Sequence, residues 1–101
     1  MKNKANSLAI TQGKGFKLEF ENGYSLSVQI GTFNYCDNFY DDYKEADFSK
    51  TGFIQSTTCE MAIIKNGTLI IWPTHSEDYQ TVGEYIPVGD IPKWINYVSN
   101  L

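Results

Sequence analysis

Two short stretches near the start of the chain alternate between apolar and polar residues, as a half-buried β-strand does. In residues 16–20 and 26–30 every second side chain is apolar, and an Asn22-Gly23 pair lies between them. Because successive side chains of a strand point to opposite faces, a three-residue loop over 21–23 keeps both apolar faces together. Gly23 then takes the positive φ of a bulged turn. The pairs predicted in this register are Phe20 with Tyr24, Leu18 with Leu26, and Phe16 with Val28.

A second hairpin is predicted over residues 57–72, with its turn at Asn66-Gly67. Residues 61–64 form a continuous apolar run, which is typical of a central strand that is covered on both faces. The apolar run 69–72 continues beyond the turn. A continuous run has no alternation to fix the pairing, so the register of this hairpin stays open.

The C-terminal residues repeat apolar side chains at the spacing of one helix face. Pro92 suits the first helical position, and Ile91 before it is expected to occupy the cap position. Just upstream, residues 85–88 are expected to add an edge strand, since Pro87 cannot donate to an interior ladder. The helix face consists of Ile91, Trp94, Ile95, Val98 and Leu101.

These elements predict one α+β domain over residues 1–101, with an antiparallel sheet of four to five strands and one C-terminal helix packed on it. Residues 1–13 are expected to be a flexible N-terminal segment, and 31–52 a long acidic and aromatic loop between the hairpins. The chain has neither the apolar run of a signal peptide nor a stretch of ~20 apolar residues that would span a membrane. We therefore expect a cytoplasmic protein.

The net charge of the chain is concentrated in one segment. Residues 34–47 hold five acids, four aromatic rings and one lysine, which accounts for the whole net charge of −4. The remaining acids and lysines balance, and all eight basic residues are lysine. Without clustered positive charge or the arginine fork, direct nucleic-acid binding is not expected.

The two cysteines and the single histidine are candidates for a catalytic site or a metal site. Cys36 with His75 as its base would make a thiol nucleophile, but neighbouring acids oppose thiolate formation, so Cys36 is interpreted as a packed thiol beside Tyr35. Cys36, Cys59 and His75 give only three zinc ligands. The acids of 37–47 are suitable calcium ligands, but they lack the order of an EF-hand loop. We expect thiols in a reducing compartment, no metal, no cofactor and no enzyme activity.

Motifs in several parts of the chain carry a family resemblance. Gly-Phe-x-x-x-Phe-x-Asn-Gly at 15–23 is followed by Ser-Val-Gln-x-Gly at 27–31, Asn-Tyr-Cys at 34–36 and Ser-Thr-Thr-x-Glu at 56–60. With these motifs and its proline-started C-terminal segment, the chain resembles a widespread family of small phage and prophage proteins. It departs from that pattern at 31–33, where members usually have Gly-Pro-Gly. The resemblance implies an origin on a mobile genetic element and carries over no settled activity.

The leading hypothesis is a phage-type counter-defence protein that blocks a basic, nucleic-acid-binding host effector, as an anti-CRISPR protein would. Its carboxylates would occupy positions meant for phosphates, while tyrosines would supply desolvated contact area. Small accessory phage proteins are often counter-defence factors, which is an analogy. The expected binding residues are Asp37, Tyr40, Asp41, Asp42, Tyr43, Glu45 and Asp47.

Two alternatives stay open. One is a small-molecule sponge, formed by a homo-oligomer, that sequesters a nucleotide immune signal. Its phosphate contacts would come from Lys14 and Lys17, and its base contacts from Tyr35, Trp72 or Trp94. The other is an accessory phage protein without catalytic activity.

Overall fold

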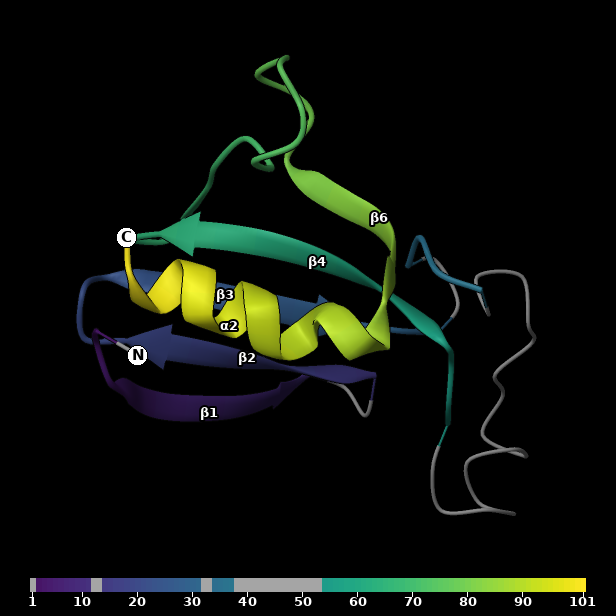
Figure 1. Cartoon of the computed structure of the whole chain (residues 1–101), viewed down its shortest axis with the longest axis horizontal. Coiled ribbons are helices and arrows are strands. Elements are labelled where there is room, and N and C mark those ends of the chain that lie inside the picture. The colour runs from purple at the N-terminus through teal and green to yellow at the C-terminus, as the bar shows by residue number, and fades with distance from the viewer. Residues whose placement is uncertain (1, 12–13, 32–33, 38–53) are drawn as a thin grey trace.

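One antiparallel sheet and one helix build the fold (Figure 1). The structure is a computed structural model, and it describes residues 2–11, 14–31, 34–37 and 54–101. The sheet has six strands, ordered β1-β2-β3-β4-β5, with β6 also paired to β4. The α+β class predicted from the sequence is confirmed, with one more strand than the expected maximum. The strands are β1 (Ala5–Thr11), β2 (Gly15–Phe20), β3 (Tyr24–Gln29), β4 (Thr58–Lys65), β5 (Thr68–Leu69) and β6 (Val82–Pro87).

The β2–β3 hairpin has the register that the alternation predicts. Leu18 pairs with Leu26 and Phe16 with Val28, so the apolar side chains of both strands share one face. Gly23 has a φ of 86° and its N–H donates to the Phe20 carbonyl at 3.1 Å, as the three-residue bulged turn requires. This face becomes one wall of the core.

Strand β1 corrects the expectation of a flexible N-terminal segment over residues 1–13. Ala5–Thr11 pairs antiparallel with β2, and Leu8 lies opposite Leu18. The segment was not recognised as a strand because its apolar side chains Leu8 and Ile10 stay exposed, so burial gives little signal there. Its backbone pairing with β2 holds it in the sheet.

Strand β4 is central, as predicted, because it pairs with β3 on one side and with both β5 and β6 on the other. Its hairpin with β5 turns at Asn66-Gly67, where φ is 48° and 86°, and pairs Ile64 with Leu69. The two faces of β4 differ in burial. Cys59, Met61 and Ile63 are fully buried on the helix side, whereas on the second face Ala62 is buried and Glu60 and Ile64 are half-buried. The predicted cover on both faces is therefore complete on one face and partial on the other.

Helix α2 (Ile91–Ser99) lies across the apolar face of the sheet along β3, after a short 3-10 helix, η1 (Val88–Asp90) (Figure 1). Asp90, not Ile91, is the N-cap residue, and Pro92 lies in the first turn as expected. Between the helix and the sheet, the ring centroids of Trp72 and Trp94 lie 4.5 Å apart. No helix of the described residues is long and apolar enough to cross a membrane. The buried core consists of Phe20, Leu26, Val28, Cys59, Met61, Ile63, Trp72, Ile86, Trp94 and Val98.

Candidate protein-binding surface

A bulge in strand β6 shapes the polar side of the sheet. Cys59 pairs with Ile86 and Met61 with Gly83, so two residues of β6, Glu84 and Tyr85, lie opposite the single residue between them on β4. Tyr85 has a φ of 52°, in the left-handed region that L-residues seldom adopt. The bulge turns the Tyr85 amide out of the ladder, and its N–H donates to the Tyr35 carbonyl at 2.9 Å.

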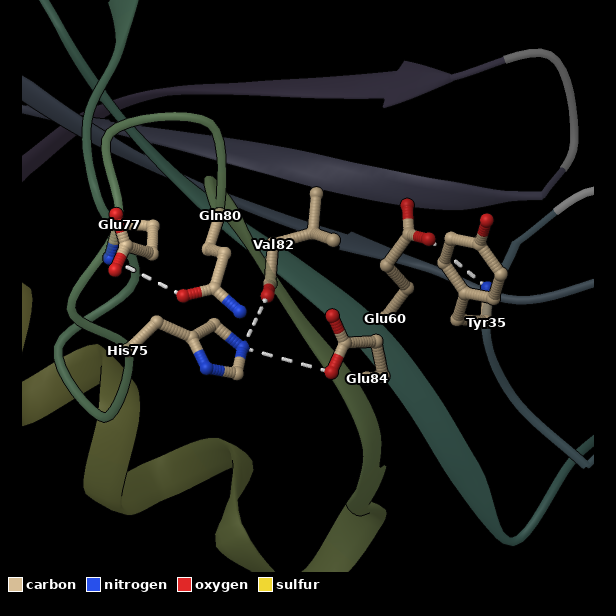
Figure 2. Close-up of polar contacts among 7 residues, drawn as sticks. All are labelled: Tyr35, Glu60, His75, Glu77, Gln80, Val82 and Glu84. Carbon is tan, nitrogen blue, oxygen red and sulfur yellow. Dashed lines mark hydrogen bonds and ion pairs between the residues drawn. The ribbon is translucent and has the colours of Figure 1, made fainter.

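The segment 34–37 is held against strand β4 by its backbone amides. The Tyr35 N–H donates to the Glu60 carboxylate at 2.9 Å (Figure 2), and the Asp37 N–H donates to the Thr58 hydroxyl at 2.8 Å. The Thr57 hydroxyl also donates to the Asp37 carboxylate. These contacts fix the start of the acidic stretch 34–47 on the rigid centre of the sheet.

Glu60 and Glu84 lie near one another, and the surroundings of Glu60 favour the protonated form of its carboxyl over the ionised form. Burial raises the pKa of the Glu60 carboxyl, and the negative charge of Glu84 raises it further, while the hydrogen bond from the Tyr35 N–H lowers it. The net effect is a rise. A half-buried carboxylate with a raised pKa gains more than a free one when a partner brings a positive charge.

His75 forms the rim of this carboxylate pair (Figure 2). Its Nε2 lies 3.0 Å from the Val82 carbonyl and 3.5 Å from a Glu84 carboxylate oxygen. A carbonyl oxygen only accepts, so the contact with Val82 places the ring proton on Nε2. His75 therefore helps to position Glu84, and its side chain is directed toward β6.

Two exposed tyrosines complete the surface. Tyr35, whose N–H contacts the Glu60 carboxylate, is 47 % exposed, and Tyr85, which follows Glu84 in the bulge, is 48 % exposed. Tyrosine offers apolar area with a polar tip at a low entropy cost, and carboxylates accept charged hydrogen bonds from lysine or arginine. We call this set the Tyr-Glu surface; it consists of Tyr35, Asp37, Glu60, Glu84 and Tyr85.

Of the seven binding residues predicted in the acidic stretch, Asp37 alone lies in the described part of the chain. It is exposed and belongs to the Tyr-Glu surface. The others, Tyr40, Asp41, Asp42, Tyr43, Glu45 and Asp47, lie outside the described residues, so their contribution stays a prediction.

The residues predicted for a small-molecule site are not brought together. Trp72 and Trp94 are only 2 % and 7 % exposed and belong to the core. They line a hollow of about 230 Å³ with His75 and Lys93 at the β6 edge. Lys17 lines a different hollow and pairs with Glu19 at 3.4 Å. Tyr35 belongs to the Tyr-Glu surface, and Lys14 lies in the turn before β2.

The two cysteines are thiols in the interior, and neither is part of a disulfide. Cys36 and Cys59 are both buried, and the Cys36 thiol contacts the Gly31 carbonyl at 3.8 Å. Burial raises the pKa of the Cys59 thiol to about 11, helped by Cys36 and by the charge of Asp90. The Nε2 atom of His75 contacts Val82 and Glu84, so these contacts do not place the ring as a base for Cys36. Among the described residues no group of three or more His, Cys, Asp or Glu side chains is placed to hold a metal.

Sequence reasoning missed Glu60, Glu84 and Tyr85 as members of a binding surface. Glu60 appears in the Ser-Thr-Thr-x-Glu motif, which was the one available signal, while nothing local marks Glu84 or Tyr85. Comparison of the chain with protein-family models, with curated proteins and with solved structures finds no match.

Proposed function

We propose that this protein is a non-catalytic binding protein that covers a basic, nucleic-acid-binding surface of a host protein. The observation that carries the proposal is the pair of neighbouring carboxylates, Glu60 and Glu84, together with two exposed tyrosines, Tyr35 at the Glu60 carboxylate and Tyr85 next to Glu84 in the chain. Lysine and arginine side chains of a partner would meet both the negative charge and the aromatic faces there. The role that we propose is recognition of a partner without a chemical reaction.

The rigidity of the surface supports this role. The Tyr35 N–H donates to the Glu60 carboxylate and the Tyr85 N–H to the Tyr35 carbonyl, so the backbone of both tyrosines is held against β4 and β6 before any partner binds. Pre-organised groups lose less conformational entropy on binding, which favours affinity. The bulge at Tyr85 is the structural device that brings the two strands' side chains together.

The wider role that we propose follows the family resemblance. A phage-type protein in the cytoplasm of a bacterial host would use the Tyr-Glu surface to occupy phosphate positions on a defence effector. The acids of 38–47 would extend the same surface and steer association through their charge. Inhibition would then be competitive with the nucleic acid that the effector binds.

Capture from a bacterial host lysate at low and moderate salt tests the proposal. The protein retained by the wild type is identified, and its binding is then measured with the purified pair. We expect the Glu60→Gln, Glu84→Gln double variant to weaken binding roughly tenfold or more, and added DNA or RNA to displace the wild type. The matched control is Glu19→Gln with Glu77→Gln, which removes the same charge elsewhere and should leave the affinity unchanged.

A second variant set separates the two parts of the acidic surface. Changing Asp41, Asp42, Glu45 and Asp47 to amides should slow association and weaken its dependence on salt. If the double variant at Glu60 and Glu84 and this quadruple variant both bind as the wild type does, the acidic surface is not the binding site and the proposal is wrong.

A further inference from the structure

Strand β1 is an edge strand with an apolar face. In the described part of the chain it pairs with β2 alone. Leu8 is 61 % exposed and Ile10 is 71 % exposed, and no charged residue occurs within Ala5–Thr11. Natural sheets usually protect an edge with lysine, proline or a bulge that stops further pairing. Strand β1 has a register shift between Ala5 and Ser7, but from Ser7 to Thr11 its register with β2 is regular.

The opposite edge of the sheet has several of these protections. Strand β6 ends in Pro87, which has no N–H to donate, and carries the charged Glu84. The bulge at Tyr85 twists the strand, and the Tyr85 amide already donates to Tyr35. The contrast singles out β1 as the edge that is open to a further strand.

The direction of the backbone groups on β1 follows from its turn. The Lys14 N–H donates to the Thr11 carbonyl at 2.9 Å, so the Thr11 carbonyl points toward β2. Successive residues of a strand direct their backbone groups to opposite sides. The N–H and C=O groups of Leu8 and Ile10 therefore point away from β2, to the free edge.

We propose that β1 is a self-association surface, on which a second copy of this chain pairs antiparallel through a two-fold axis at Ala9. In that register Leu8 of each copy lies opposite Ile10 of the other, and both residues have their backbone groups directed at the partner copy. All four apolar side chains then lie on the helix side of one continuous sheet, and the paired residues 7–11 carry no charge. Centring the axis on Leu8 would instead place Ile10 opposite Asn6.

Self-complementarity is what favours a second copy over another partner. A two-fold interface requires that one patch match itself, and the spacing of Leu8 and Ile10 about Ala9 meets that requirement. The uncharged strand offers a partner of strong charge nothing to recognise. A strand-to-strand contact is small for a protein interface, so the dimer should dissociate on dilution. This inference is independent of the Tyr-Glu surface.

Engineered cysteines test the register directly. In the proposed dimer the two Ala9 residues form a non-hydrogen-bonded pair with Cα atoms about 4.5 Å apart, which is within disulfide reach. Two Ser7 residues on the same face would be about 14 Å apart, which is too far. Under mild oxidation the full chain carrying Ala9→Cys should become mostly a covalent dimer, while Ser7→Cys should stay monomeric. The native thiols are buried and should not interfere.

Sedimentation of the uncrosslinked protein gives the second measurement. The wild type should shift from dimer toward the 11.5 kDa monomer on dilution, and Ile10→Lys should be monomeric throughout, with a thermal melt equal to that of the dilute, monomeric wild type. Leu69→Lys, at an exposed apolar residue of β5, should still dimerise. The inference is wrong if the wild type is monomeric at every concentration up to ~0.5 mM, or if Ala9→Cys crosslinks no better than Ser7→Cys.

Discussion

Glu60 is subject to opposing influences on the ionisation of its carboxyl, which the fold brings together from distant parts of the chain. Burial and the nearby charge of Glu84 disfavour its ionised form, and the Tyr35 N–H favours it. A raised pKa in the folded state means that the stabilising contribution of Glu60 is complete below its ordinary pKa of 4.5 and is lost as the pH rises through the folded value. At neutral pH the charge of Glu60 therefore opposes folding.

Replacing Glu60 with glutamine should stabilise the protein at pH 7. The amide oxygen can still accept from the Tyr35 N–H, while the charge is gone, so we expect a gain of about 0.5 kcal/mol in the free energy of unfolding. At pH 3, below the ordinary pKa of Glu60, its carboxyl is protonated and the gain should vanish. Urea unfolding at both pH values measures this, and Glu19→Gln is the control. A gain of equal size at both pH values would show that charge is not its cause.

At the scale of elements, one side chain joins the first hairpin to the C-terminal helix. The Asn22 amide donates to the Val98 carbonyl at 3.1 Å and to the Leu101 carbonyl at 3.2 Å. Its Oδ1 accepts from the Tyr24 N–H at 3.1 Å, which closes the turn. The turn between β2 and β3 therefore also contacts the C-terminal end of α2, where the Val98 carbonyl accepts from the Leu101 N–H as well.

Changing Asn22 to aspartate separates these two tasks. Aspartate keeps the acceptor for Tyr24, but it loses both donors and places a negative charge at the negative end of the helix dipole. We expect Asn22→Asp to lower the free energy of unfolding by about 1–2 kcal/mol, and Asn22→Ala by about 1 kcal/mol. Thermal and denaturant melts compare them. If aspartate is the milder change, the contact with the helix end contributes little.

The elements show which parts of the fold the sequence could predict. Strict alternation and an Asn-Gly turn were enough for the register of Leu18 with Leu26, because a one-residue slip would bury polar side chains. Strand β1 was missed because it is held by pairing and not by burial. The Tyr-Glu surface was missed because the contact of Tyr35 with Glu60 spans 25 residues. In addition, the residue with left-handed backbone in the bulge is Tyr85. A glycine at that position would have indicated a positive φ from the sequence, and a tyrosine does not.

At the scale of the whole molecule, the buried thiols report on how the fold opens. Cys59 lies on the central strand, and Cys36 lies in the segment that the amides of Tyr35 and Asp37 fasten to β4. Both should become accessible in the same global unfolding event. The raised pKa of Cys59 also means that little thiolate is present there at neutral pH.

We expect neither native thiol to react with a disulfide reagent at pH 7.5 on the time scale of minutes, and both to react promptly in denaturant. At intermediate denaturant the two should be modified together, because global unfolding exposes both. Mass spectrometry of the modified chain counts the thiols. An early species modified only at Cys36 would show that the segment 34–37 opens on its own.

The position of the Tyr-Glu surface at the far side of the sheet from β1 has a geometric consequence. In a β1-paired dimer the two copies of β4 are seven strand steps apart, about 34 Å at the usual spacing. Neighbouring strands rotate by about 20–25° each, so the two surfaces would be turned through roughly 140–175° relative to one another. They would face nearly opposite directions. Such a dimer could not bind two neighbouring sites on one flat partner. It would instead bind two separate partner molecules and crosslink them.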